Sequence, residues 1–263
     1  MATIQEIAAQ VRNGNLDLGR KHYALGLMHG IVQAQYSGYK KIIAIEFGVG
    51  TGSGLLSLIK AADFFRNSGI DIEVYGFDTG TGLPASTGDY RDHPEIWSVG
   101  QIAMDKEVSI EDFKKNLPPW AHFIQGNISE TINTFIEEFE KNDSVVGFVS
   151  MDLDYYSSTK DALKIFEMAP TKYVPAVPIY FDDINWLITY SQWAGVGLAI
   201  KEFNEEHELR KLESKETYFQ IENFYVCHVF DNPIRTGAQS PVAQFEIFAK
   251  PTGMVHPPGG LMI

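Results

Sequence analysis

Short apolar runs alternate with helical patterns along most of this chain, and this alternation limits the possible folds more than any other feature. The sequence predicts strands over residues 42–47, 72–77, 121–125, 144–151 and 176–181. The helices that it predicts cover residues 52–66, 107–116, 129–140, 158–168 and 193–209. Strands that are apolar almost throughout and are separated by helices indicate a doubly wound α/β fold, in which a mostly parallel sheet is covered on both faces. Ligands of such sheets bind at the carboxyl ends of the strands.

The two ends of the chain depart from this alternation. Residues 1–40 predict an N-terminal helical extension, with a Thr3-x-x-Glu6 capping box before its first helix and a second helix over residues 18–36. After residue 210, the segments TYFQI, FYVCHVF and VAQFEIFA are strand-like and have no helices between them, so we expect an antiparallel edge. The main domain should then cover residues 41–250, followed by an extended tail over residues 251–263.

Charge and cysteine content exclude several kinds of partner. The chain has 34 acidic and 21 basic residues, a formal net charge of −13 and no dense cluster of Lys or Arg, which argues against a nucleic-acid partner. The single cysteine, Cys227, can form neither a disulfide framework nor a thiolate metal site within the chain. Because the sequence has no signal peptide and no apolar run long enough to span a bilayer, we expect no membrane partner and a cytoplasmic location.

Four alternating glycines follow the first predicted strand, in the sequence AIEFGVGTGSG of residues 44–54. Glycine suits a tight turn or a close approach of the backbone to a ligand. The GxGxxG pattern of nicotinamide-binding loops is broken, because Ser53 stands where its third glycine should be. A phosphate-binding P-loop is excluded as well, because no Gly-Lys-Ser/Thr follows.

The alternation of glycines resembles motif I, Glu/Asp-x-Gly-x-Gly-x-Gly, of class I S-adenosylmethionine (SAM)-dependent methyltransferases, which have a Rossmann-like fold. This resemblance implies that the loop passes beneath the methionine part of SAM, with Gly48, Gly50 and Gly52 beside the cofactor. It also implies that Glu46, the acid at the end of the strand, helps to orient the cofactor.

Polar residues at the ends of the next two strands extend the expected cofactor site. Asp78 ends the second strand, where a carboxylate can accept hydrogen bonds from both hydroxyls of a ribose, although Asp is also common in turns. After the third strand, Gly126 and Asn127 stand where class I methyltransferases often place an Asp or Asn near the adenine amino group.

Several aspartates follow the fourth and fifth predicted strands. Either Asp152 or Asp154 would meet the pair Asp182 and Asp183 at one edge of the sheet. Carboxylates gathered in this way repel each other unless a cation neutralises them, and oxygen ligands suit Mg²⁺. The alternative is structural, since Asp154 could begin the next helix with Ser158-x-x-Asp161 as its capping box, and Asp182 or Asp183 could cap a turn.

The ordered segments FDTGTGLP, MDLDYYSSTKDAL, YFDDINW and GVGLAIKEFNEEH resemble the macrocin O-methyltransferase family over about residues 41–231. Members of that family methylate sugar hydroxyls of macrolides and related natural products. The resemblance implies that Asp152, Asp182 and Asp183 bind the metal. The sequence departs from the family pattern where Gly80-Thr81 replaces the usual Phe-Glu, and residues 85–116 do not align.

The segment over residues 84–118, between the second and third strands, mixes aromatic, charged and polar residues and lies above the expected site. We therefore expect it to form a substrate lid, and we refer to it as the lid segment. His93 within it could accept the proton of an acceptor hydroxyl, because histidine titrates near neutral pH. A surface His-Pro turn explains His93 equally well, and His122, near the third strand, is the second candidate for the base.

Together these features favour a SAM-dependent O-methyltransferase that acts on a hydroxyl of a small molecule, such as a sugar or a phenolic natural product, with the help of Mg²⁺. A metal-independent N- or C-methyltransferase would instead keep its activity in a chelator. A cofactor-binding protein without catalysis would form no product, and a nicotinamide oxidoreductase is disfavoured by the broken glycine spacing. The apolar N-terminal helices could also form the interface of a homo-oligomer.

Overall fold

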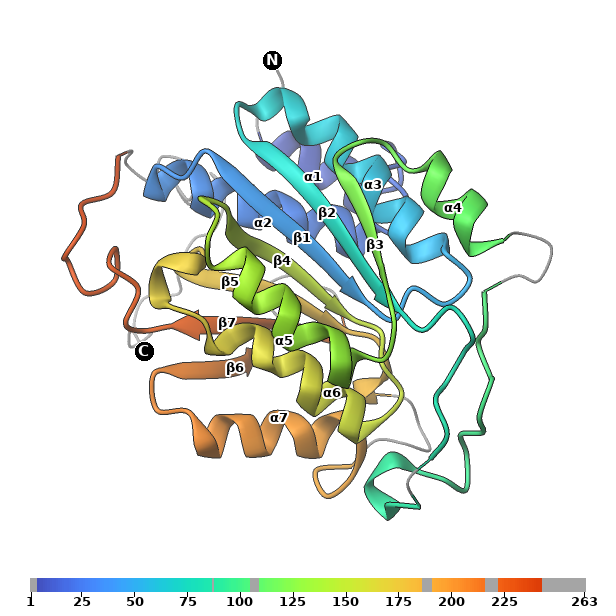
Figure 1. The fold of residues 1–263 in the computed structure, drawn as a ribbon. Helices are drawn as coiled ribbons and strands as arrows, with labels where there is room; N and C mark the ends of the chain where they lie inside the picture. Colours follow the sequence, from blue (N-terminus) through green and yellow to red (C-terminus); the bar gives the residue numbers. More distant parts are fainter. Residues whose placement is uncertain (1–3, 87, 105–108, 186–190, 216–221, 243–263) are drawn as a thin grey trace.

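A seven-stranded sheet forms the centre of the molecule, in the order β3-β2-β1-β4-β5-β7-β6 (Figure 1). The computed structural model describes residues 4–86, 88–104, 109–185, 191–215 and 222–242. The strands are β1 (Lys41–Phe47), β2 (Asp71–Asp78), β3 (Ala121–Gln125), β4 (Val145–Met151), β5 (Ala176–Phe181), β6 (Arg210–Ser214) and β7 (Phe224–Val229). β1 to β5 pair in parallel, whereas β7 pairs antiparallel with both β5 and β6. The mostly parallel sheet with an antiparallel C-terminal edge is therefore confirmed.

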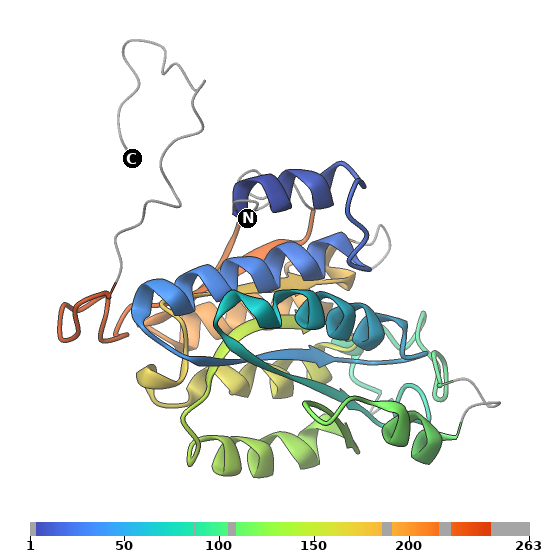
Figure 2. The same ribbon diagram turned by 90° about the horizontal axis from the view of Figure 1, so that it is seen from above.

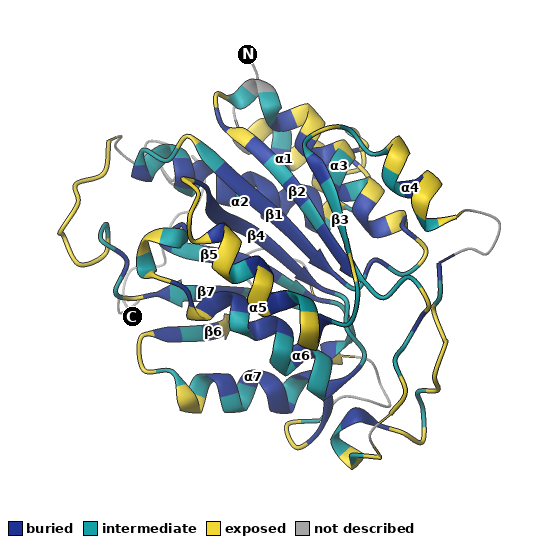
Figure 3. Cartoon of the chain, in the orientation of Figure 1, coloured by how far each residue is buried: buried dark blue, intermediate teal, exposed yellow. Residues whose placement is uncertain are grey.

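Helices cover both faces of this sheet (Figure 2). They are α1 (Ile4–Arg12), α2 (Lys21–Ser37), α3 (Ser53–Phe65), α4 (Ile110–Asn116), α5 (Ile128–Phe139), α6 (Tyr156–Leu163) and α7 (Gly195–Glu206). α2 and α3 lie on one face, with α1 packed on α2, and α5, α6 and α7 lie on the other. The strands between these layers are largely buried (Figure 3). Among the described helices, none combines the length and the apolar character needed to cross a membrane.

Two glycines let α2 pack closely on the centre of the sheet. Gly26 and Gly30 are four residues apart and therefore lie on the same side of the helix. A Cβ atom on Gly26 would lie 2.2 Å from the ring of Phe148, and one on Gly30 would lie 2.0 Å from the carbonyl oxygen of Gly147. The backbone of α2 thus rests directly on β4, which makes the N-terminal segment part of the core and brings the start of α2 near the ends of the strands.

Four central strands end in register, and this arrangement positions the site. Phe47 of β1 pairs with Phe77 of β2 and with Met151 of β4, and Met151 pairs with Phe181 of β5. The residues that directly follow this row are Gly48, Asp78, Asp152 and Asp182. The glycine loop and the acidic residues therefore share one edge of the sheet, as the doubly wound fold predicts.

The secondary structure excludes one alternative that the sequence leaves open and adds a strand that the sequence does not predict. α6 begins at Tyr156 with Tyr155 as an N-cap that makes no side-chain hydrogen bond, so Ser158-x-x-Asp161 is not a capping box. β6 begins at Arg210, where the sequence analysis has no strand. Apolar residues would be expected at the inward-facing positions of such a strand. In β6 one of these positions is taken by Arg210, which is buried and forms an ion pair with Asp231.

Other expectations lie outside the described residues. These are Thr3 of the first capping box, the segment TYFQI, all of VAQFEIFA after Val242, and the tail over residues 251–263.

Candidate active site

The glycine loop, residues 48–52, joins β1 to α3 in backbone conformations that favour glycine. The φ angles of Gly48, Gly50 and Gly52 are 84°, 51° and 90°. A Cβ atom on Gly48 would lie 1.8 Å from the carbonyl oxygen of Asp152. The loop backbone therefore lies against the end of β4, and a side chain at position 48 would separate the two.

Asp78 at the end of β2 is bonded to the glycine loop. Its Oδ2 accepts a hydrogen bond from the backbone N–H of Gly50 at 2.9 Å, and its Oδ1 accepts one from Gly80 at 2.6 Å. Burial raises the pKa of Asp78, and these backbone donors oppose that shift because they stabilise the charged form. Each carboxylate oxygen has a second lone pair, so Asp78 can still accept hydrogen bonds from a ligand.

A cavity of about 530 Å³ lies at this edge of the sheet. The glycine loop and Asp78 form one part of its wall, and residues 152–155 after β4 form another. The lid segment contributes Pro84, Trp97, Gln101 and Ile102. A cavity of this size, with apolar and polar walls, suits a small-molecule ligand.

Gly126 and Asn127 line the same cavity. The N–H of Gly126 donates to the carbonyl oxygen of Asp78 at 2.9 Å, which ties the two strand ends together. Asn127 is the N-cap of α5, and its Oδ1 accepts hydrogen bonds from the backbone N–H and the hydroxyl of Ser129 at 3.2 and 3.0 Å. The cap engages the acceptor Oδ1, so the Nδ2 amide group is left to donate to a ligand. A donor suits a ring nitrogen, which accepts, rather than an amino group, which donates.

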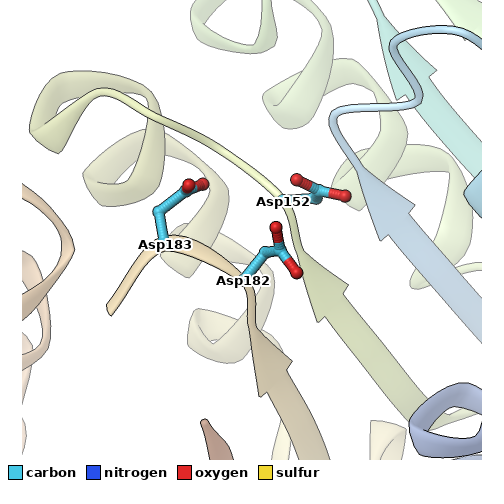
Figure 4. Close-up of side chains that lie close together, drawn as sticks. All are labelled: Asp152, Asp182 and Asp183. Atoms are coloured by element: carbon cyan, nitrogen blue, oxygen red, sulfur yellow. The ribbon is translucent and has the colours of Figure 1, made fainter. Parts of the chain in front are cut away.

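Asp152, Asp182 and Asp183 come together at the ends of β4 and β5 (Figure 4). One carboxylate oxygen from each lies within 4.8 Å of the others. Asp154 lines the same cavity but does not belong to this group. Between the two alternatives that the sequence leaves open, the structure therefore places Asp152, rather than Asp154, with the pair after β5.

Burial and mutual repulsion disfavour the charged forms of Asp152, Asp154 and Asp183. Burial raises the pKa of Asp152 to about 6, and the charge of Asp182 adds to this shift. Burial also raises the pKa of Asp154 and of Asp183, and the neighbouring carboxylates raise both further. A bound divalent cation would remove the repulsion, and an all-oxygen donor set fits Mg²⁺. The residues present thus fit a metal ion of this kind.

Arg20 and Tyr23 connect this group to Glu46. Arg20 Nη1 donates to Asp152 Oδ2 at 3.1 Å and to the hydroxyl oxygen of Tyr23 at 3.0 Å. The Tyr23 hydroxyl in turn donates to Glu46 Oε1 at 2.6 Å. Burial raises the pKa of Glu46 well above its usual range. A Cβ atom on Gly54 would lie 1.9 Å from Glu46 Oε1, so the fourth glycine of the motif makes room for this carboxyl.

Glu46 does not line the cavity, in contrast to the other acids expected at the site. Its side chain is fully buried and bonded to Tyr23 of α2, beneath the start of α3. The structure therefore brings the expected cofactor residues Gly48, Gly50 and Asp78 to the cavity and holds Glu46 behind them. Gly52 does not line the cavity, and a Cβ atom there would lie 2.9 Å from the ring of Phe113.

Neither histidine expected to act as a base lines the cavity. His93 is 9% exposed and its Nδ1 lies 3.0 Å from Glu95 Oε1. His122 is the second residue of β3, and its ring lies 4.7 Å from that of Tyr75. It stands three residues before Gln125, the partner of Asp78, and so lies away from the carboxyl end of the strand where the cavity is.

The lid segment is anchored to α6 through Asp92. This carboxylate is 1% exposed and accepts hydrogen bonds from the backbone N–H of Ser157 at 2.8 Å and from its hydroxyl at 3.0 Å. The guanidinium carbon of Arg91 lies 4.4 Å from the centre of the Tyr156 ring. Asp92 thus supplies α6 with the N-terminal cap that Tyr155 does not provide.

Arg20 is a cavity residue that the sequence analysis missed. It is separated from Asp152 by 132 positions and from Ser53 by 33, so no local pattern marks it as part of the site. Its position depends on the close packing of α2 on β4.

The fold is similar to those of two methyltransferases of known structure. The calicheamicin methyltransferase CalS11 matches with a TM-score of 0.54 and 20% sequence identity, over 86% of this chain and 90% of that one. The O-methyltransferase NovP matches with a TM-score of 0.50 and 16% identity, over 78% of this chain and 79% of that one. The chain therefore shares the Rossmann-like fold of these two proteins. No protein-family model matches the sequence, and neither does any curated protein.

Proposed function

We propose that this protein is a SAM-dependent O-methyltransferase that methylates a hydroxyl group of a small molecule with the help of Mg²⁺. The observation that carries the proposal is that one cavity is lined both by the glycine loop with Asp78 and by the three aspartates after β4 and β5. The similarity in fold to a calicheamicin methyltransferase and to an O-methyltransferase supports it. The acceptor would be a sugar or a phenolic natural product.

The glycine loop and Asp78 would hold SAM. Gly48 and Gly50 line the cavity, and the absence of a side chain at Gly50 would let the cofactor approach the loop backbone closely. Asp78, fixed by the N–H groups of Gly50 and Gly80, would accept hydrogen bonds from the ribose hydroxyls. SAM supplies an electrophilic methyl group on a positively charged sulfur, which the acidic cavity tolerates.

The aspartates would hold the metal beside the acceptor. Asp152, Asp182 and Asp183 offer the oxygen ligands that Mg²⁺ prefers. When bound, a divalent cation lowers the pKa of a coordinated hydroxyl. The protein would align the acceptor oxygen with the methyl group, so that the new C–O bond forms as the C–S bond breaks, the sulfonium becomes a neutral thioether and the hydroxyl proton passes to water.

The lid segment would cover the reacting groups. Trp97 and Ile102 line the cavity, and the Asp92 contact with Ser157 holds the segment against α6. Exclusion of water strengthens the electrostatic interactions within a closed site.

The cofactor site can be tested without knowledge of the acceptor. Isothermal titration calorimetry would measure binding of SAM and of its demethylated product, S-adenosylhomocysteine (SAH), to the wild-type protein and to Asp78→Ala. We expect the variant to bind SAH about 10- to 100-fold more weakly, because a charged hydrogen-bond acceptor is worth about 1.5–3 kcal/mol. Wild-type protein that binds neither compound would disprove the proposal.

The metal site needs a separate measurement. Electron paramagnetic resonance with Mn²⁺ in place of Mg²⁺ would compare the wild-type protein with Asp182→Asn. Asp154→Asn is the matched control, since Asp154 lines the same cavity outside the group of three. We expect Mn²⁺ affinity to fall strongly in Asp182→Asn and to change little in Asp154→Asn. Full activity in a chelator, once an acceptor is found, would favour the metal-independent N- or C-methyltransferase.

A further inference from the structure

Arg20 lies at one end of the glycine loop with part of its guanidinium group still available. It directly precedes α2 and lines the cavity. Nη1 donates to Asp152 and to Tyr23, whereas the one contact of Nη2 with the described residues is a long one, 3.4 Å, with the hydroxyl of Ser53. Among the described residues, Nε has no hydrogen-bond acceptor. Since a guanidinium has five N–H donors, Arg20 can bind a further anion.

The charges around the cavity single out this residue. Within the described part of the chain, Arg20 is the only Lys or Arg that lines the cavity. The acidic residues of the lining are Asp78, Asp152, Asp154, Asp182, Asp183 and Glu222. A negatively charged group of a ligand would be repelled by most of this wall and attracted only near Arg20.

The local backbone adds positive potential at the same place. Ser53 is the first residue of α3, and the N-cap of that helix, Gly52, supplies no side chain to its free N–H groups. A Cβ atom on Gly54 would lie 3.1 Å from Arg20 Nη1, so the guanidinium lies against the first turn of α3. The start of a helix and an arginine therefore face the same end of the cavity.

Two places along the glycine loop would bind different groups of a ligand. Near its middle, Gly50 donates to Asp78, the proposed partner of the ribose hydroxyls. Directly after the loop, Ser53 contacts Arg20. If a cofactor lies along the loop with its ribose at Asp78, the part that extends from the ribose along the loop would point toward Arg20. In SAM, that end is the methionine part, whose carboxylate is the only anionic group of the molecule.

We propose that Arg20 binds the α-carboxylate of the methionine part of SAM and thereby fixes the position of the cofactor along the glycine loop. This inference rests on the proposed function. A charge-assisted hydrogen bond of this kind is about twice as strong as a neutral one. The contact of Arg20 with Asp152 would at the same time connect the cofactor to the neighbouring acidic residues.

A simpler role for Arg20 would be to neutralise Asp152, and a matched pair of ligands separates the two roles. One ligand is SAH, and the other is its decarboxylated analogue, which keeps the adenosine, the thioether and the amine but lacks the carboxylate. If Arg20 binds the carboxylate, substitution of Arg20 weakens the binding of SAH only. If Arg20 acts through Asp152 or through the fold, substitution of Arg20 changes the binding of both ligands alike.

The test is isothermal titration of both ligands into wild-type protein, Arg20→Met, Arg20→Lys and Lys21→Met, in a chelator to remove metal ions. Lys21 is the control, because it is exposed at the start of α2 and its loss also removes one positive charge. We expect Arg20→Met to bind SAH about 10- to 100-fold more weakly and to bind the analogue as the wild type does. Arg20→Lys should lose less affinity for SAH, and Lys21→Met should match the wild type.

The possible failures are distinguishable. Equal losses for both ligands in Arg20→Met, or no loss for SAH, would overturn the role of Arg20 while wild-type binding of SAH upholds the cofactor site. Wild-type protein that binds neither ligand would overturn the proposed function and this inference together. Retained binding of the analogue also demonstrates that Arg20→Met is folded.

Discussion

Gly48 and Gly69 form a matched pair of residues, because both have φ of 84° but differ in the space around them. A Cβ atom on Gly48 would lie 1.8 Å from the carbonyl oxygen of Asp152, whereas one on Gly69 would meet nothing within 4 Å. We expect Gly69→Ala to lower the free energy of unfolding by about 1 kcal/mol, the cost of the left-handed conformation. Gly48→Ala should lower it by about 3 kcal/mol or more, because the clash adds to this cost.

Urea denaturation of both variants would measure this difference. Equal effects of the two substitutions would mean that conformation alone requires glycine at position 48. A larger loss for Gly48→Ala would support the close contact between the glycine loop and the end of β4, on which the position of Asp152 depends.

At the scale of elements, the contact between the lid segment and α6 predicts how one substitution changes stability and proteolysis. Asp92 caps the start of α6 through the backbone and the hydroxyl of Ser157. We expect Asp92→Ala to lower the free energy of unfolding by about 1–2 kcal/mol, the usual cost of a lost helix cap, and to speed proteolysis within the lid segment. Asp89→Ala is the control, because within the described part of the chain the Asp89 carboxylate bonds to nearby Arg91 alone, so its loss should cost less than about 1 kcal/mol. Proteolysis of Asp92→Ala at the wild-type rate would contradict the anchoring role.

For the whole molecule, two histidines of α2 predict how stability depends on pH. Burial lowers the pKa of His22 and of His29 to about 4, and nearby cationic groups add to both shifts. Between about pH 6.5 and pH 4 the unfolded chain therefore binds protons that the folded chain does not, so each histidine lowers the free energy of unfolding as pH falls. The raised pKa of Asp152 acts in the opposite direction, since the folded chain binds that proton more strongly.

Comparison of the wild-type protein with His29→Gln isolates one of these contributions. Urea denaturation would be measured at pH 7, 6 and 5. As the pH is lowered, the free energy of unfolding should fall less steeply for the variant than for the wild type. Below pH 6 the two slopes should differ by about 1 kcal/mol per pH unit. Parallel dependences in the two proteins would contradict a neutral, half-buried His29 in the folded state. The homo-oligomer suggested by the N-terminal helices stays a prediction.

Local patterns of the sequence determined the order of strands and helices and the residues at the strand ends. Apolar periodicity depends on neighbouring residues only, and parallel strands end at a common edge, so Gly48, Asp78, Asp152 and Asp182 could be assigned to one site without a structure. The edge strand β6 could not be predicted, because a buried and paired Arg210 conceals its pattern.

The tertiary structure alone decided which side chains face the cavity. Glu46 belongs to the same motif as the glycine loop, yet its side chain turns toward Tyr23 of α2 and away from the cavity. His93 and His122 have suitable chemistry but lie elsewhere, whereas Arg20, the residue before α2, lines the cavity although it is 132 positions away from Asp152 in the sequence. The physical reason is that the direction of a side chain depends on long-range packing, here of α2 on β4, which no local pattern records.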